Sequence, residues 1–234
     1  MTSPRLRIHY FTDVLCVWAY LAQVRLDELI KNYAADIEIS YHFMPIFACT
    51  EHRIGEGWKD KGGYQAFSRH TQEVCAAYPY LNLHKDVWQL NTPKTSATSH
   101  LFIKAIQCLV DNGVINNEPQ ADLQHRTLFE EYAWQVRLAF FQDAKDIGNK
   151  SVLMDIATSL QLPVTEIQHV LDDGSALAAL FRDIELRDEF RVEGSPTYIL
   201  NEGRQKLYGN VGYRIIEANL HEILKQPKVE ASWC

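Results

Sequence analysis

Several features are missing from this sequence, and each absence excludes a class of protein. No stretch approaches the roughly 18 consecutive apolar residues of a membrane-spanning helix, so no membrane partner is expected. Lysine and arginine are scattered rather than gathered into a basic stripe, which argues against nucleic-acid binding. Neither a G-x-G-x-x-G nor a Walker-type loop is present, so no motif indicates a nucleotide cofactor. The opening residues, MTSPRLRIHYF, lack a long apolar segment before a cleavage site, and we expect a cytoplasmic protein.

Paired cysteines and grouped metal ligands are missing as well. The 234 residues include five cysteines, an odd number at irregular spacing, so the sequence predicts reduced thiols rather than a disulfide framework. The nine histidines do not group with cysteines in the manner of a zinc site, and no metal is expected. We interpret four of the cysteines as packed or incidental and single out the first. The five are Cys16, Cys49, Cys75, Cys108 and Cys234.

The beginning of the chain has the pattern of a β-α-β unit. Residues 6–12, LRIHYFT, alternate apolar and polar side chains and then become aromatic, which predicts a strand. Residues 17–33 place apolar side chains on one face at helical spacing. Residues 37–44, IEISYHFM, predict a second strand. The connection is long enough for a right-handed crossover between parallel strands.

The middle of the chain is helical in pattern, and strands return near its end. Four glycines within residues 55–63 indicate a loop, and amphipathic helices follow to about residue 190. Strands are predicted at 196–200 and 205–209, joined by a hairpin turn, before a last helix at 213–225. The fold class is therefore α/β, with a mixed four-stranded sheet and an inserted all-helical subdomain. We assign residues 1–50 and 190–227 to the sheet domain, 51–189 to the helical insertion, and 228–234 to a flexible tail.

Two motifs at opposite ends of this order resemble those of a known family. Cys16-Val17-Trp18-Ala19 is similar to a Cys-x-x-Cys motif at a helix start, and Gly194-Ser195-Pro196-Thr197 is similar to a cis-proline segment. A weaker match is TPKTSATSHLFIKAIQ, residues 92–107. Together they resemble the DsbA-like branch of the thioredoxin superfamily. The third motif and the sequence DVLC also resemble kappa-class glutathione transferases and 2-hydroxychromene-2-carboxylate isomerases, which carry serine at the position of Cys16.

The resemblance implies thiol chemistry at Cys16 and a thioredoxin-like fold. Cys16 is expected at a helix N-terminus, where unpaired N–H groups and the helix dipole favour a thiolate and lower the pKa of the thiol. Ala19 replaces the second cysteine, so no internal disulfide can close there. A second thiol must come from outside, and glutathione is the expected co-substrate, with no tightly bound cofactor. The alternative interpretation of Cys16 is a small buried hydrophobic residue.

The resemblance also points to further site residues, each with a structural alternative. A cis Ser195–Pro196 bond would expose the backbone of Ser195 to a peptide or to glutathione, whereas a trans-proline would only end a strand. Trp18 is expected to line the cleft or to pack in the core. Thr95 and Ser96 are expected to hold a ligand carboxylate or simply to cap a helix. Asp13 is expected chiefly to end its strand and cap a turn.

Three functions remain open on this sequence. The first is a single-cysteine thiol–disulfide oxidoreductase acting on a small thiol or disulfide. The second is a glutathione-dependent transferase or isomerase in which Cys16 positions the glutathione thiol and the helical insertion covers an aromatic substrate. The third is a binding module that kept the fold and lost turnover. A homodimer is compatible with each of them.

Overall fold

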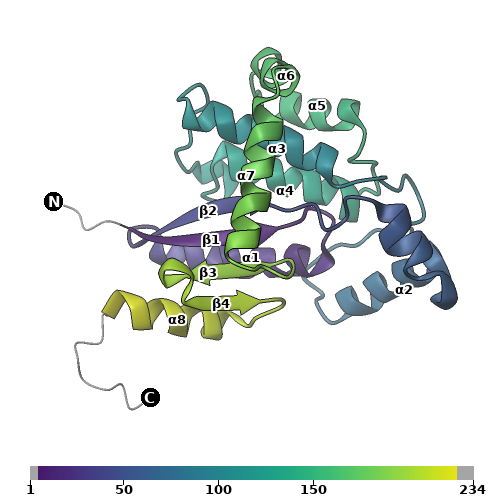
Figure 1. The fold of residues 1–234 in the computed structure, drawn as a ribbon, viewed down its shortest axis with the longest axis horizontal. Coiled ribbons are helices and arrows are strands. Elements are labelled where there is room, and N and C mark those ends of the chain that lie inside the picture. The colour runs from purple at the N-terminus through teal and green to yellow at the C-terminus, as the bar shows by residue number, and fades with distance from the viewer. Residues whose placement is uncertain (1–4, 226–234) are drawn as a thin grey trace.

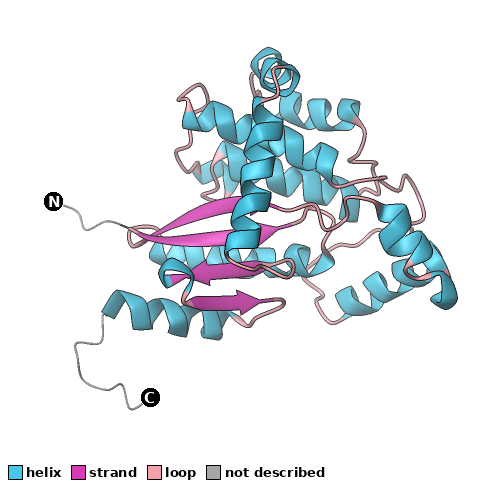
Figure 2. Cartoon of the chain, viewed as in Figure 1, coloured by secondary structure: helices cyan, strands magenta, loops and turns pink. Residues whose placement is uncertain are grey.

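The computed structural model describes residues 5–225, in which a four-stranded sheet has helices on both faces (Figures 1 and 2). The strands are β1 (Leu6–Thr12), β2 (Ile37–Phe43), β3 (Thr197–Leu200) and β4 (Gln205–Tyr208). Their order is β2-β1-β3-β4, with β1 and β2 parallel and the other pairs antiparallel. The predicted mixed sheet is therefore confirmed. The predicted tail at 228–234, with Cys234, lies outside the described residues.

Side chains alternate between the two faces of the sheet, as the period of an extended strand requires. Ile8 and Tyr10 of β1 face α1 (Val17–Tyr33) and α8 (Tyr213–Lys225). Phe11 points to the other face, against the C-terminal end of α7 (Ser175–Glu189), which crosses the front of the sheet in Figure 1. Each fully buried large apolar side chain contributes about 1.5–3 kcal/mol, so this alternation fixes the register.

The remaining helices pack with one another around a second, larger apolar core. Figure 1 shows α3 to α6 stacked above the sheet, while α2 lies apart at the end of the sheet near the C-terminus of β1. None of the helices within residues 5–225 is long and apolar enough to cross a bilayer. The helices are α2 (Gly63–Ala76), α3 (Ala97–Asp111), α4 (Leu128–Phe141), α5 (Lys150–Ser159) and α6 (Val164–Asp172).

The glycine-rich segment before α2 is helical, and the loop predicted there is wrong. It contains a π-helical turn, η1 (Glu51–Glu56), and a 3-10 turn, η2 (Lys59–Lys61). At Gly57 a Cβ atom would lie 2.4 Å from the carbonyl oxygen of Arg53, so glycine permits a close backbone approach. Gly62, with φ of 108°, lets the chain turn directly into α2. These glycines join short helical turns, and their composition alone resembles that of a loop.

A buried carboxylate attaches α7 to the sheet and to α3. The Asp183 carboxylate accepts hydrogen bonds from Lys104 Nζ at 2.9 Å and from the backbone N–H of Phe43 at 2.8 Å. His42 Nδ1 lies 2.9 Å from its other oxygen. All three charged or titratable side chains are buried. Removing one partner of such a group leaves an uncompensated charge in the interior, at a cost of about 3–5 kcal/mol.

We predict that Asp183→Ala lowers the free energy of unfolding by about 3–5 kcal/mol, because Lys104 then keeps a buried charge without a carboxylate. Asp188→Ala on the same helix is the control. Asp188 is exposed and pairs only with its neighbour Arg187, so its loss should change stability by less than about 0.5 kcal/mol. Urea unfolding followed by circular dichroism measures both. Equal effects of the two substitutions would contradict the role assigned to Asp183.

Candidate active site

Cys16 is the N-cap residue of α1, as predicted from the sequence. Its carbonyl oxygen accepts hydrogen bonds from the N–H groups of Ala19 and Tyr20 at 3.1 and 3.0 Å. Its sulfur makes no cap hydrogen bond and instead donates to the carbonyl oxygen of Ser195 at 3.1 Å. The side chain is 7% exposed. The thiol therefore sits at a helix start, enclosed and held by a segment 179 residues away.

Burial raises the pKa of the Cys16 thiol, which corrects the expectation of a lowered value. Loss of hydration is the largest cause, because it disfavours the thiolate. The negative charge of Asp13 raises the pKa further. Hydrogen bonding by the Ser195 side chain and the Ala19 backbone lowers the pKa by more than Asp13 raises it, and the charge of Arg137 lowers it by the least, but desolvation outweighs them all. The raised pKa favours the thiol over the thiolate at neutral pH.

The segment that holds the thiol begins β3. The Ser195–Pro196 peptide bond is cis, and Pro196 is buried. Pairing of Thr197 with Phe11 places this segment beside the end of β1. The hydroxyl of Ser195 accepts a hydrogen bond from the N–H of Asp13 at 3.0 Å, while its carbonyl oxygen faces the thiol. The two sequence motifs are thus brought into direct contact.

Position 194 in this segment requires glycine because an aromatic ring lies very close to it. A Cβ atom at Gly194 would lie 2.7 Å from the ring of Tyr208 on the edge strand β4. That separation is shorter than a normal contact, so any side chain there would displace the ring. The glycine therefore lets Tyr208 lie over the segment that carries Ser195.

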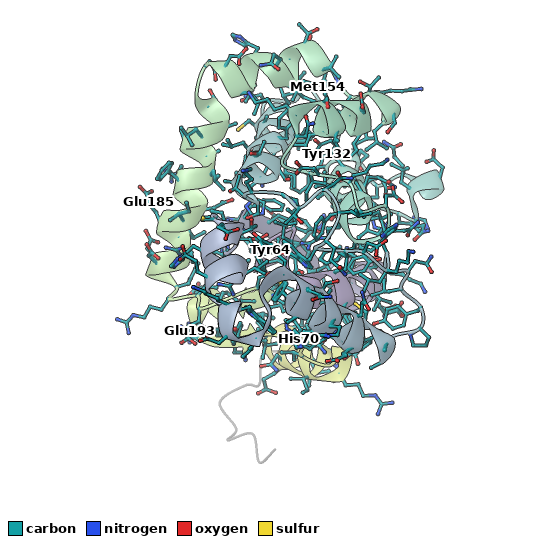
Figure 3. The ribbon with its side chains drawn as sticks, turned by 90° about the vertical axis from the view of Figure 1, so that its right-hand side faces the viewer. Tyr64, His70, Tyr132, Met154, Glu185 and Glu193 are labelled. Carbon is teal, nitrogen blue, oxygen red and sulfur yellow. The ribbon has the colours of Figure 1, made fainter. Side chains whose placement is uncertain are left out.

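A cavity of about 430 Å³ opens beside Cys16. Of the two positions expected for Trp18, the structure shows the one in the cavity wall, and Ser195 also lines the cavity. Pro196 is buried and does not line it, and the ligand-binding roles of these residues stay predictions. Figure 3 looks onto this end of the molecule, with His70 of α2 and Glu193 of the segment before β3 both in its lower half. Six aromatic side chains contribute to the wall, and the charged residues among the lining, Arg53 and Glu193, are exposed. The lining residues are Leu15, Cys16, Val17, Trp18, Ile46, Phe47, Arg53, Trp58, Phe67, His70, Trp88, Glu193, Gly194, Ser195 and Tyr208.

The sequence analysis missed the part of this wall that comes from the segment between residues 53 and 88. Arg53 lies over the ring of Phe47, 4.9 Å from its centroid, and Trp58 packs against Phe67 and His70. A loop was expected at residues 55–63 and helices after it, and none of the aromatic residues in this stretch was assigned to the site. Trp58 lies between the glycines and Phe67 just after them, but their spacing does not distinguish a cavity wall from a packed core.

Thr95 and Ser96 lie away from the cavity. Ser96 is fully buried, its hydroxyl donates to Asp13 Oδ2 at 2.8 Å, and its N–H donates to the carbonyl oxygen of Phe47 at 3.0 Å. No donor of Ser96 is left for a ligand carboxylate, so this expectation is wrong. Thr95 accepts a hydrogen bond from the N–H of Ala97 at 3.0 Å, which is the capping alternative. It does not line the cavity, so a ligand role for Thr95 stays a prediction.

Asp13 has the structural role expected of it, and it joins more segments than the one turn that was predicted. Its carboxylate is fully buried and closes the turn after β1 by accepting from the N–H of Leu15 at 2.8 Å. Its second oxygen accepts from the N–H of Phe47 at 3.0 Å and from Ser96. One carboxylate therefore holds the cysteine turn, the cavity wall and the start of α3 together.

The three other cysteines within residues 5–225 are not part of this arrangement. Cys75 is buried and Cys108 partly buried, and burial raises the pKa of Cys75 to about 11. Cys49 is exposed and does not line the cavity. Within residues 5–225, no three histidine, cysteine or acidic side chains are grouped as metal ligands.

His100 packs behind the Asp13 turn as a neutral side chain. Its Nε2 atom accepts a hydrogen bond from the N–H of Val14 at 3.2 Å and lies 3.6 Å from Asp13 Oδ1. Burial lowers the pKa of His100 from 6.5 to about 4. Because the folded pKa is below the unfolded value, the unfolded chain binds the proton first as pH falls. The contribution of neutral His100 to the free energy of unfolding is fully present above pH 6.5 and is lost as pH falls toward 4.

We predict that His100 alone accounts for a loss of about 3 kcal/mol in unfolding free energy across this pH window. Burial and the neighbouring His42 also lower the pKa of His9 to about 4, so His9 adds to the slope. Urea unfolding at several pH values should show a flatter profile for His100→Gln and the flattest for the double variant with His9→Gln. Unchanged slopes in these variants would refute the assignment.

Comparisons with known proteins agree with this geometry. No protein-family model matches the chain, and no curated protein matches it by sequence. Among solved structures, a disulfide-isomerase-like protein from Nitrosomonas europaea superposes with a TM-score of 0.72 at 12% identity, covering 96% of this chain and 100% of its own. The cytosolic disulfide reductase DsbM from Pseudomonas aeruginosa has a TM-score of 0.64 at 17% identity, covering 94% of this chain and 100% of its own. DsbM also matches in a structure with GSH.

A third match is 2-hydroxychromene-2-carboxylate isomerase, with a TM-score of 0.64 at 18% identity, covering 94% of this chain and 97% of its own. At such identities the likeness concerns the fold, which these proteins share over nearly their whole length. The chain therefore has a thioredoxin-like fold with the DsbA-like arrangement of sheet and helices.

Proposed function

We propose that this chain is a thiol–disulfide oxidoreductase that works through Cys16 alone, with glutathione or another small thiol as its co-substrate. One observation carries the proposal: the Cys16 sulfur lies at a helix start, against the Ser195 carbonyl, on the floor of an aromatic cavity. Ala19 is fully buried in the position of a second cysteine. The substrate is a small disulfide or a mixed disulfide of glutathione.

The reaction needs three exchanges. Cys16 loses its proton to water, and its thiolate attacks one sulfur of a disulfide RS–SR′, so that Cys16–S–S–R forms and R′S⁻ leaves. A glutathione thiolate then attacks the Cys16 sulfur and releases RS⁻. A second glutathione thiolate attacks the glutathione sulfur, which frees the Cys16 thiolate and releases oxidised glutathione. Two glutathione thiols are oxidised and one disulfide is reduced, and the two released thiolates take up protons.

The backbone beside Cys16 supports a peptide-like ligand. While the thiol is protonated, its hydrogen occupies the carbonyl oxygen of Ser195. When Cys16 is a thiolate or a mixed disulfide, that oxygen is free to accept an N–H from the ligand backbone. Trp18 would pack against the ligand, and Pro196 would fix the direction of the carbonyl. The proposal places the chain in the cytoplasm, where glutathione is abundant and thiols stay reduced.

We predict that oxidised glutathione adds one glutathionyl group to Cys16, because the thiol faces the cavity while no second cysteine stands at position 19 to displace it. Mass spectrometry of the peptide containing Cys16 measures the adduct. Cys16→Ser should lack it and should reduce hydroxyethyl disulfide with glutathione no faster than buffer does. Cys49→Ser, which removes an exposed thiol outside the cavity, is the control and should keep both activities. Full exchange activity in Cys16→Ser would end the proposal.

We also predict a pH profile for Cys16 alkylation that is displaced to higher pH in the folded protein. Burial raises the pKa of Cys16, so the thiolate forms at higher pH in the native chain than in the unfolded chain. Iodoacetamide labelling of the Cys16 peptide, in buffer and in urea, gives the two midpoints. A native midpoint below the unfolded one would show that the helix N-terminus dominates after all.

The neutral thiol and the aromatic wall favour a second candidate, a glutathione-dependent transferase or isomerase. In that function the Cys16 thiol donates a hydrogen bond to the glutathione thiolate, and no bond to Cys16 forms. The aromatic side chains then pack against an aromatic substrate. Protection of Cys16 by reduced glutathione, with no adduct from oxidised glutathione, would favour this candidate. No effect of either form would favour a binding module.

A further inference from the structure

Arg137 of α4 is a buried cation without a carboxylate partner in the described part of the chain. Its side chain is 3% exposed. Nη1 donates to the carbonyl oxygen of Asp13 at 3.0 Å, and Nη2 donates to Thr12 Oγ1 at 2.6 Å. No carboxylate oxygen of residues 5–225 lies within ion-pair distance of the guanidinium. A buried charge that lacks a partner is costly, so a nearby anion would be stabilised by it.

The carbonyl oxygen that Arg137 binds also holds Cys16. The N–H of Cys16 donates to the same Asp13 oxygen at 3.1 Å and closes the turn between β1 and α1. Because Arg137 also binds Thr12, the guanidinium spans the end of β1 and the start of this turn. A helix of the inserted region therefore fixes the backbone that carries the candidate nucleophile.

Two buried charges of opposite sign flank this turn. The Asp13 carboxylate is fully buried, and its three hydrogen bonds come from neutral donors. Its charge raises the pKa of Cys16, whereas the charge of Arg137 lowers it. The Cys16 sulfur is the ionisable group on this turn whose anionic form the proposed reaction requires.

The other charged or titratable groups around Cys16 do not replace Arg137. Those on the solvent side of the cavity are partly or fully exposed, and water and salt screen their charges. Burial keeps His100 neutral, with a pKa of about 4, and burial raises the pKa of each of the two tyrosines. The cavity-side groups are Arg53, His70 and Glu193, and the interior groups are Tyr10, His100 and Tyr198.

We infer that Arg137 is a positioning residue for Cys16: its guanidinium holds the Asp13–Cys16 turn and supplies the positive charge that lets the Cys16 thiolate form beside the buried Asp13 carboxylate. The inference deepens the proposed function and rests on it for the meaning of the thiolate. It does not need turnover to be tested, because the thiolate can be measured by alkylation.

The test compares the pH midpoint of iodoacetamide labelling of the Cys16 peptide in four variants. Arg137→Gln removes the charge and should raise the midpoint, with labelling on the order of tenfold slower at a fixed pH below it. Arg137→Lys keeps the charge and should stay near the wild-type midpoint. Asp13→Asn removes the opposing charge and should lower it. Arg182→Gln removes an exposed arginine of α7 and should leave it unchanged.

The direction of the shift separates this role from a purely structural one. Loosening the site would rehydrate the thiol and move the midpoint down toward that of the unfolded chain, which is opposite to the rise expected for Arg137→Gln. A fall or no change in Arg137→Gln, or a Lys variant that behaves like the Gln variant, overturns the inference. If Arg137→Gln does not fold by circular dichroism, the double variant Arg137→Gln/Asp13→Asn decides. The double variant should restore the wild-type midpoint. A midpoint equal to that of Asp13→Asn alone would refute the inference.

Failure of the proposed function gives a different result. In that case wild-type protein forms no glutathione adduct at Cys16, while the alkylation midpoints still rank by the charge at positions 137 and 13. If the proposed function and the inference about Arg137 are both correct, the rate of glutathione adduct formation in Arg137→Gln falls in parallel with the alkylation rate.

Discussion

The buried carboxylate of Asp13 is the constraint on which the rest of the site depends. It joins the turn after β1, the segment after β2 and the start of α3, through Leu15, Phe47 and Ser96. A carboxylate in the interior is tolerated only when donors surround it, so these three segments are held in one arrangement. Cys16 and the wall of its cavity follow from that arrangement. The same charge opposes ionisation of the thiol, and we have inferred that Arg137 compensates for it in the proposed reaction.

The balance between burial and charge makes the cysteine a protected group. The Cys16 thiol donates a hydrogen bond to the Ser195 carbonyl oxygen, and loss of hydration raises the pKa of the thiol. In a single-cysteine reaction, a thiolate that is always exposed would be oxidised in the absence of substrate. A thiol that ionises only when a ligand is bound beside it is consistent with such a reaction. The region between β2 and β3 contacts this site at two places: Arg137 binds the end of β1, and Trp58 lies in the cavity wall.

Much of the fold could be predicted from the sequence, because local patterns and tertiary packing agree there. The ranges 6–12, 17–33 and 213–225 match the observed strand and helices to the residue, since each has one clear apolar face. The glycine segment before α2 was misjudged because glycine serves close backbone packing there as well as it serves loops. Ser96 was misjudged because a serine at a helix start can face a ligand or a buried carboxylate, and the partner, 83 residues away, is not visible in a linear pattern.

The substrate is less predictable than the fold for a physical reason. Ala19 is fully buried in the core, and Cys16 supplies the one sulfur atom among the residues that line the cavity. In the proposed reaction a second thiol reaches Cys16 through the cavity, and the fit of that ligand depends on walls from residues 46–88 and residues 193–208. Those walls meet only after the helical insertion has packed against the sheet. The candidate nucleophile can be identified from a short motif. The shape of the cavity that would select its substrate depends on segments that are distant in the sequence and meet on folding.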